Sequence, residues 1–335
     1  MRANAKFLGQ DKGFWAHIRS LSEVLGYTTR RPSPRHPKPD TRTDIQKKSD
    51  ELAFALEGTV YAPGFAQIVE GMERLKLLSH HLKQPVADER QPTLPSAYGQ
   101  LLVEYFEYRA NQLNNVAKPQ LQTLAQAQAM YSRIRAASPP AGRVAMNKQS
   151  GEKATESYLT NMVNLLIGSN ASSIDYEQDP RLLTTFTKNQ LPVRTLARRV
   201  DGAFPAIINP VAVWEIKEYY HTRTFGSRVS GGVYETLLDG LELEEMKQEE
   251  GIDCEHLLIV DALDCWWADG RPYLCRMIDS LHMGYVDEIL FGTEIENRLP
   301  ILAQQWVVKV QAQIAHGRVV KKIPPVSSPT QVPIS

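Results

Sequence analysis

Apolar positions in the first third of the chain recur at helical intervals. Between Gly13 and Leu25 they fall on one face of a helix, and Gly26 follows where such a helix would end. The same spacing predicts further helices at about 43–57, 64–83 and, with a break near Pro119, 98–134. The N-terminal third is therefore expected to be helical.

From about residue 150 onward, helical and strand patterns alternate. Ser150 is a plausible N-cap for a helix that runs to about Ile167. Short apolar or β-branched segments predict strands, and amphipathic stretches between them predict helices. The expected strands lie near 193–204 and at 211–217, 256–261 and 288–291, and the expected helices at about 228–248 and 272–284. This order predicts an α/β domain.

The segment Ser138–Gly142, which contains two prolines, is the best candidate for a domain boundary. It divides the chain into a helical recognition or partner-binding domain at 1–145 and an α/β domain at 146–318. Residues 319–335 are rich in proline and serine and are expected to form a disordered tail.

Composition restricts the class of protein. The 335 residues include 38 Lys or Arg and 38 Asp or Glu, so no net charge attracts the whole molecule to nucleic acid. No apolar run has transmembrane length, and the N-terminus lacks a secretory signal. Three cysteines without a Cys-x-x-Cys pair indicate a reducing, cytoplasmic setting and argue against a zinc ribbon. The acidic run at 235–261 is expected to be a solvated face.

Candidate chemistry lies on the predicted strand 211–217. Alternate side chains of a strand share a face, so Glu215 and Lys217 point the same way, and a hairpin could bring Asp201 beside them. Two carboxylates can hold Mg²⁺ with several waters, and an ammonium group can orient a nucleophilic water. An exposed cross-strand ion pair is the alternative. The apolar neighbours of Glu215 and Lys217 favour the metal site instead.

Asp201, Glu215 and Lys217 resemble the motif of the PD-(D/E)xK nuclease superfamily over about residues 150–295, although Val200 stands where the family usually has proline. The resemblance implies a restriction-endonuclease-like mixed sheet flanked by helices. It also implies a Mg²⁺-dependent endonuclease that cleaves DNA, with Mn²⁺ able to substitute. Glu156, on the preceding helix, would be a further catalytic residue. The alternative is a solvated glutamate in the first turn of that helix.

Nucleic-acid contacts are expected from two segments. The proline-rich loop near residue 35 carries a cluster of cations, and the segment after the predicted Glu-x-Lys strand offers cations and an imidazole that could contact phosphates. These candidates are Arg30, Arg31, Arg35 and Lys38 in the first segment, and His221, Arg223 and Arg228 in the second.

The expected partner is double-stranded DNA. The resemblance further suggests a role in restriction or anti-phage defence, as a homodimer or with a defence-system partner protein. Two other functions stay open: an RNA-directed or structure-specific nuclease that uses the same site, and a scaffold protein with a vestigial nuclease fold. The chain has no phosphate-loop motif of an NTPase and no serine-nucleophile elbow.

Overall fold

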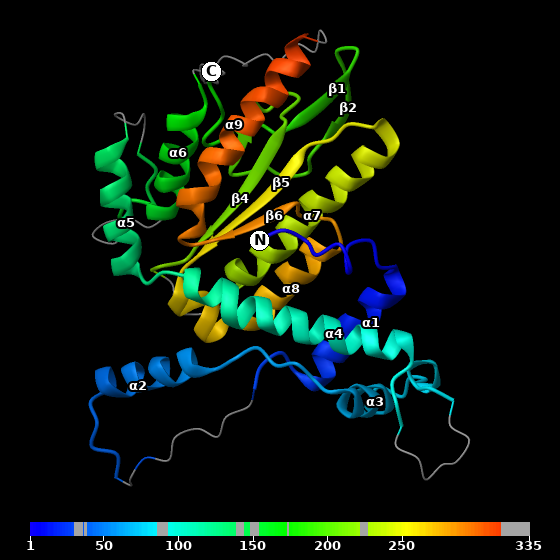
Figure 1. The fold of residues 1–335 in the computed structure, drawn as a ribbon. Coiled ribbons are helices and arrows are strands. Elements are labelled where there is room, and N and C mark those ends of the chain that lie inside the picture. The colour runs from blue at the N-terminus through cyan, green and yellow to red at the C-terminus, as the bar shows by residue number, and fades with distance from the viewer. Residues whose placement is uncertain are drawn as a thin grey trace, which may run out of the picture.

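The computed structural model describes residues 1–29, 36, 39–85, 93–138, 144–147, 154–172, 174–221 and 227–315 (Figure 1). Helices and strands alternate in the second half of the chain, which confirms the α/β class. No helix among these residues is long and apolar enough to span a membrane.

A mixed four-stranded sheet forms the centre of the second half. Its order is β3 (Gly202–Phe204), β4 (Ala212–Glu218), β5 (Glu255–Asp261) and β6 (Glu288–Phe291). β3 pairs antiparallel with β4, while β4, β5 and β6 are parallel. The parallel strands are joined through α7 (Ser227–Glu250) and α8 (Arg271–His282), because parallel neighbours need a crossover. A separate hairpin contains β1 (Thr185–Lys188) and β2 (Leu191–Thr195).

Helices cover both faces of the sheet, as Figure 1 shows. On one face, the apolar core includes residues of α6 (Tyr158–Asn170) and α9 (Glu294–Ala315), and Trp214 stacks on Trp306 with ring centroids 5.7 Å apart. On the other face, α7 and α8 pack over the alternate residues of β4, β5 and β6. Double coverage explains why β5 is a continuous apolar run, as predicted.

The N-terminal helices are α1 (Lys12–Leu25), α2 (Asp44–Glu57), α3 (Phe65–Arg74) and α4 (Ala97–Asn111), with a short 3₁₀ turn at His80–Leu82. The expected helix at 64–83 was too long. Lys76 adopts a left-handed φ of 57°, and Leu77 N donates to Met72 O at 2.9 Å. This is the hydrogen bond of a Schellman cap, which ends a helix.

The break expected near Pro119 is confirmed. After α4 the chain passes through a π-helical segment, Gln112–Ala117, and a 3₁₀ turn, Lys118–Gln120, before α5 (Leu124–Ala137). Residues of α5 share the core of α6 and α9. The expected domain boundary, Ser138–Gly142, lies outside the described residues except for Ser138, and the expected tail at 319–335 lies outside them as well.

The helix expected to start at Ser150 begins at Tyr158 instead. The first amide groups of α6 find their acceptor in Glu218 at the end of β4: Thr160 N and Oγ1 both donate to Glu218 Oε2 at 3.1 Å. A carboxylate at this end also complements the helix dipole. Glu156 therefore precedes the helix, where it forms an isolated antiparallel bridge with Met146.

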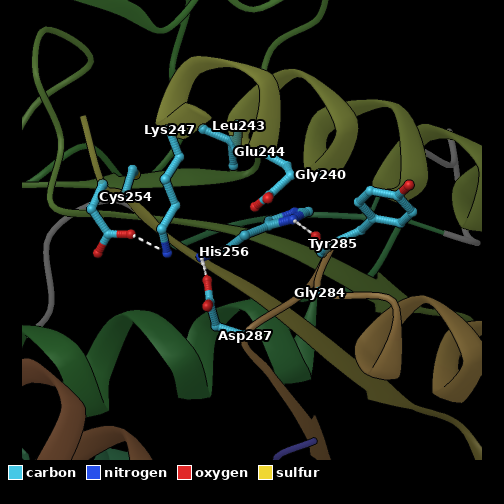
Figure 2. A pocket seen from close by; sticks show the side chains of 10 residues that line it. Gly240, Leu243, Glu244, Lys247, Cys254, His256, Gly284, Tyr285 and Asp287 are labelled. Carbon is cyan, nitrogen blue, oxygen red and sulfur yellow. Dashed lines mark hydrogen bonds and ion pairs between the residues drawn. The ribbon is translucent and has the colours of Figure 1, made fainter. Parts of the chain in front are cut away.

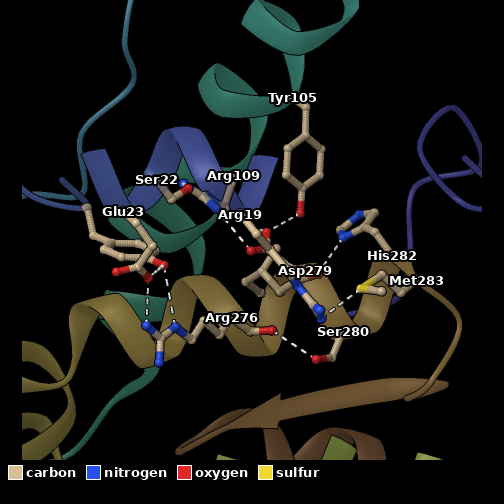
Figure 3. A network of polar contacts seen from close by, with 12 residues as sticks. Arg19, Ser22, Glu23, Tyr105, Arg109, Arg276, Asp279, Ser280, His282 and Met283 are labelled. Atoms are coloured by element: carbon tan, nitrogen blue, oxygen red, sulfur yellow. Dashed lines mark hydrogen bonds and ion pairs between the residues drawn. The ribbon is translucent and has the colours of Figure 1, made fainter. Parts of the chain in front are cut away.

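A buried ion pair anchors the N-terminal helices on α8 (Figure 3). Arg109 of α4 lies 3.1 Å from both carboxylate oxygens of Asp279 on α8. Tyr105 Oη donates to Asp279 at 2.6 Å, and Arg109 Nη2 donates to Ser22 of α1 at 3.0 Å. Both charged side chains are almost completely buried, so each depends on the other for compensation.

We expect Asp279→Asn to lower the free energy of unfolding by about 3–5 kcal/mol, because it leaves the Arg109 charge buried without a counter-ion. The matched control is Glu23→Gln. Glu23 pairs with Arg276 at 2.7 Å on the same interface but is 61% exposed. Its loss should cost less than about 1 kcal/mol. Urea unfolding of the two variants provides the measurement, and equal small losses would contradict an anchoring role for Asp279.

Candidate functional site

Glu215 and Lys217 share the face of β4 that α7 covers. Their side chains are 0% and 5% exposed, and Lys217 Nζ donates to Glu215 Oε2 at 2.8 Å. Burial on a strand within the sheet follows from the apolar residues that alternate with them. The predicted shared face is confirmed, and the pair is not an exposed one.

Asp201 is fixed beside this pair by the backbone. It stands immediately before β3, where Asp201 N donates to Trp214 O at 3.1 Å and Ile216 N donates to Asp201 Oδ2 at 2.8 Å. The next residue has to be small, because a Cβ on Gly202 would lie 2.1 Å from the Trp214 ring. Asp201 lies near enough to Glu215 and Lys217 for their charges to affect its pKa, and it precedes β3 instead of ending a strand. That the two carboxylates converge within reach of one metal ion stays a prediction.

Arg198, in the loop between β2 and β3, is a site residue that no sequence motif indicated. Its Nη1 lies 2.8 Å from Glu215 Oε1, and its Nη2 donates to Glu215 Oε2 at 3.1 Å. Nη1 also donates to Oδ2 of Asp239 on α7, and Nη2 is 3.5 Å from Glu235. Asp239 is fully buried, so the expectation that the whole acidic run is a solvated face was wrong.

We call this group the charge cluster. It contains four carboxylates and two cations: Asp201, Glu215, Glu235, Asp239, Arg198 and Lys217. The sequence did contain a signal for the two acids of α7. Glu235 and Asp239 are four residues apart, so they lie on the same face of the helix, and that face also carries buried residues.

The electrostatics of the cluster show a surplus of negative charge. Burial and the nearby Glu215 raise the pKa of Asp201 to about 6, and the same two causes raise the pKa of Asp239 to about 7. Burial also opposes ionisation of Glu215, but Lys217 and Arg198 outweigh it and hold the pKa of Glu215 below its ordinary value. Oδ1 of Asp239 is buried with no hydrogen-bond partner among the described residues.

The donor set fits a hard divalent cation better than zinc. Within the described ranges, no three His, Cys, Asp or Glu side chains are arranged to hold a metal ion. Asp201 and Glu215 supply two carboxylates, and Mg²⁺ is often held by one or two carboxylates together with waters and substrate phosphates. A structural zinc site needs four nitrogen or sulfur ligands. The surplus negative charge of the cluster suits a cation.

Other predicted residues lie elsewhere or outside the described part. Glu156 is 3.2 Å from Arg135, and no described contact joins it to Asp201 or Glu215. His221 is exposed, with Nε2 3.1 Å from Thr155 Oγ1. The remaining nucleic-acid candidates are not described in their side chains: Arg30, Arg31, Arg35, Lys38, Arg223 and Arg228.

A small pocket lies under α7, farther along the same face of the sheet (Figure 2). His256 of β5 donates from Nδ1 to Tyr285 O at 2.8 Å, because a carbonyl can only accept. Its buried Nε2 is left as an acceptor without a partner in the described structure. The pocket holds about 30 Å³, which is room for one or two waters but not for a nucleotide.

Comparison with known families places the chain in a family whose function is unknown. Residues 122–306 match the model of a domain of unknown function, DUF7687, over more than half of the chain. The chain belongs to the DUF7687 family. Residues 1–116 match a second domain of unknown function, DUF7690. No curated protein and no solved structure matches the chain. The DUF7687 region contains the whole charge cluster and the sheet that carries it.

Two adjacent glycines of α7 provide a test of how closely the helix packs on Lys217. A Cβ on Gly232 would lie 3.1 Å from Lys217 Cδ and 3.2 Å from Tyr219 Oη, whereas one on Gly231 would meet nothing within 4 Å. Gly231→Ala should therefore stabilise the protein by up to about 1 kcal/mol through helix propensity. Gly232→Ala should lose this gain, because it crowds Lys217. Urea unfolding of both variants checks the difference, and an equal gain would contradict close packing.

The raised pKa of Asp201 predicts a pH-dependent effect of Asp201→Asn. In the folded state the pKa is about 6 rather than 3.8, so this group favours folding at low pH, and its contribution is lost as the pH rises through 6. Asp201→Asn should therefore be more stable than the wild type by about 2–3 kcal/mol at pH 8. The advantage should disappear below about pH 4. Asp253→Asn, at an exposed position, is the control for urea unfolding across this range, and a pH-independent difference for Asp201→Asn would contradict the assignment.

Proposed function

We propose that this chain is a divalent-metal-dependent nuclease with a restriction-endonuclease-like fold, which hydrolyses phosphodiester bonds in DNA. The observation that carries the proposal is the hydrogen bond from Ile216 N to Asp201 Oδ2, 2.8 Å long. It holds the Asp201 carboxylate at the backbone of the residue between Glu215 and Lys217, near enough for both charges to affect its pKa. Two carboxylates and an ammonium group in a buried setting are costly to maintain, which is common at functional sites.

The order of elements also supports the proposal. A helix, α6, precedes antiparallel strands, and β4 is followed by the crossover helix α7 and the parallel strand β5. This is the order that the resemblance to PD-(D/E)xK nucleases implies. A role in restriction or anti-phage defence and a homodimeric state stay predictions from the same resemblance.

Asp201 and Glu215 would hold the metal. When bound, a divalent cation stabilises negative charge on a phosphoryl oxygen and acidifies a water. Asp201 suits this position because it is only partly buried, and Oδ1 has no hydrogen bond within the described part of the chain. Above about pH 6 its carboxylate is ionised and able to bind a cation.

Lys217 would act as a charged hydrogen-bond donor. Burial alone would lower the pKa of Lys217, but Glu215 and Asp201 outweigh burial and raise it. The side chain is therefore an ammonium group at neutral pH, which can orient a nucleophilic water but cannot accept its proton. Its role in the proposed reaction is orientation and charge stabilisation.

We expect Asp201→Ala and Glu215→Ala each to reduce Mg²⁺-dependent cleavage by at least about 10²-fold, because the charge-stabilising cation is lost. Lys217→Arg should also lose turnover, since a planar fork replaces a compact ammonium group. Cleavage of plasmid, single-stranded DNA and RNA, with Mg²⁺ or Mn²⁺, measures activity and identifies the substrate.

Glu245→Ala is the matched control, because Glu245 is an exposed acid of α7 that pairs with Arg194 outside the charge cluster. Mg²⁺ should raise the melting temperature of the wild type and of Glu245→Ala, but not that of Asp201→Ala. Full metal-dependent activity in Glu215→Ala would falsify the proposed site. Absence of cleavage on all three substrates, despite Asp201-dependent metal binding, would favour the scaffold alternative.

A further inference from the structure

Arg198 is paired with Glu215, the carboxylate that would ligate the proposed metal. Its two terminal nitrogens lie 2.8 and 3.1 Å from the two oxygens of Glu215, and Lys217 Nζ also donates to Oε2. Oε2 of Glu215 accepts hydrogen bonds from both Arg198 and Lys217, whereas Oε1 lies 2.8 Å from Arg198 Nη1 but has no hydrogen-bond partner among the described residues. A divalent cation that ligates Oε1 of Glu215 would lie close to the Arg198 guanidinium, and the repulsion between the two positive groups favours the departure of Arg198.

Asp239 holds Arg198 at the same time as Glu215 does. Asp239 is fully buried on α7, and its Oδ2 accepts from Arg198 Nη1. The Arg198 side chain is 23% exposed, while Glu215 and Asp239 are both 0% exposed. Arg198 is thus more exposed than either of these two carboxylates, and Asp239 can retain it after it leaves Glu215.

We propose that Arg198 is a phosphate-binding residue, which is held on Glu215 in the metal-free protein and released toward the substrate backbone when metal binds. Asp239 is the positioning residue that keeps the released guanidinium at the site. The inference rests on the proposed nuclease function. Its ligand is the phosphodiester backbone of DNA, because a guanidinium fork matches two phosphate oxygens. Such a contact positions the strand without reading its sequence.

Lys217 is less suited to this role. It is almost fully buried, and its contacts, Glu215 at 2.8 Å and Glu235 at 3.6 Å, keep it inside the cluster. A guanidinium carries five N–H donors, so Arg198 can keep one hydrogen bond to Asp239 and still present others to a phosphate. The two cations therefore have different roles. Lys217 stays bound to Glu215, and Arg198 moves from Glu215 to a phosphate of the substrate.

The first experiment measures metal binding without substrate. Mn²⁺ titration by calorimetry compares the wild type with Asp201→Ala, Arg198→Gln and Arg199→Gln. Arg199 is the matched control, because it is the neighbouring arginine, is exposed, and has no ion pair among the described residues. Arg198→Gln should bind Mn²⁺ about tenfold more tightly, because a competing cation is removed from Glu215. Arg199→Gln should bind it as the wild type does.

The second experiment measures DNA cleavage and binding at saturating Mn²⁺. Arg198→Gln should lower kcat/KM by about 10²-fold, as expected for loss of a charged donor at the reacting phosphate. The salt dependence of DNA affinity, measured with Ca²⁺ in place of Mn²⁺, should flatten by about 0.9 log unit, because one phosphate is no longer neutralised by the protein. Arg198→Lys keeps a counter-charge for Asp239, so a folded variant is available, and it should also lose turnover because the fork is gone.

Asp239→Asn tests the positioning role. The guanidinium is still present in this variant but is held less firmly, so KM for DNA should rise more than kcat falls. A residue that only stabilises the fold would change the melting temperature without this split. An unchanged KM would overturn the role of Asp239.

The outcomes separate the inference from the proposed function. Mn²⁺ binding by Arg198→Gln that is equal to or weaker than that of the wild type would overturn release by metal. Unchanged kcat/KM in Arg198→Gln would overturn phosphate binding. If the wild type shows no Asp201-dependent Mn²⁺ binding, the metal site itself is wrong, and that result is independent of Arg198.

Discussion

The charge of Glu215 is the constraint on which the site depends. A carboxylate that is 0% exposed, on a strand covered by helices, must be compensated within the protein. Lys217 compensates it from the same strand and Arg198 from the preceding loop. Arg198 in turn engages Asp239, which ties α7 to that loop. One buried charge thus connects a strand, a loop and a helix. Removal of any partner would leave the remaining charged groups buried without a compensating charge.

The geometry of the site is kept by packing rather than by the charges alone. Gly202 leaves room for the Trp214 ring, which stacks on Trp306 of α9. This fixes β3 against β4, and the backbone of Ile216 then holds Asp201. Because Glu215 and Lys217 stand on a paired strand and Asp201 is bonded to its backbone, these three are held more firmly than residues on a free loop would be. Packing on the aromatic face of β4 therefore keeps the charged residues of the opposite face in position.

Local patterns were enough to predict β4, β5 and β6 and the pair Glu215 and Lys217 on β4, whereas β1 was not predicted and the strand expected near 193–204 is two strands, β2 and β3, with a loop between them. The β-branched segment that became β4 and the apolar run that became β5 carry their signal within seven residues each. Contacts across long separations could not be predicted in the same way. Arg198 meets Asp239 41 positions later, and that meeting depends on how α7 lies on the sheet. Likewise, α6 begins at Tyr158 because Glu218, far along the chain, accepts its first amide groups.

The surplus of acid in the cluster bears on the choice between an active site and a vestigial scaffold. Asp201 and Asp239 both have a pKa raised mainly by burial, and Asp239 Oδ1 has no partner among the residues described. A protein that needed only the fold would be more stable with amides or apolar groups at these positions, since buried ion pairs are often replaceable without loss. Destabilising arrangements of this kind are typical of sites that bind a ligand. A cation at Asp201 and Glu215 would remove the surplus. The electrostatic cost is therefore accounted for by the proposed metal site and left unexplained by a scaffold.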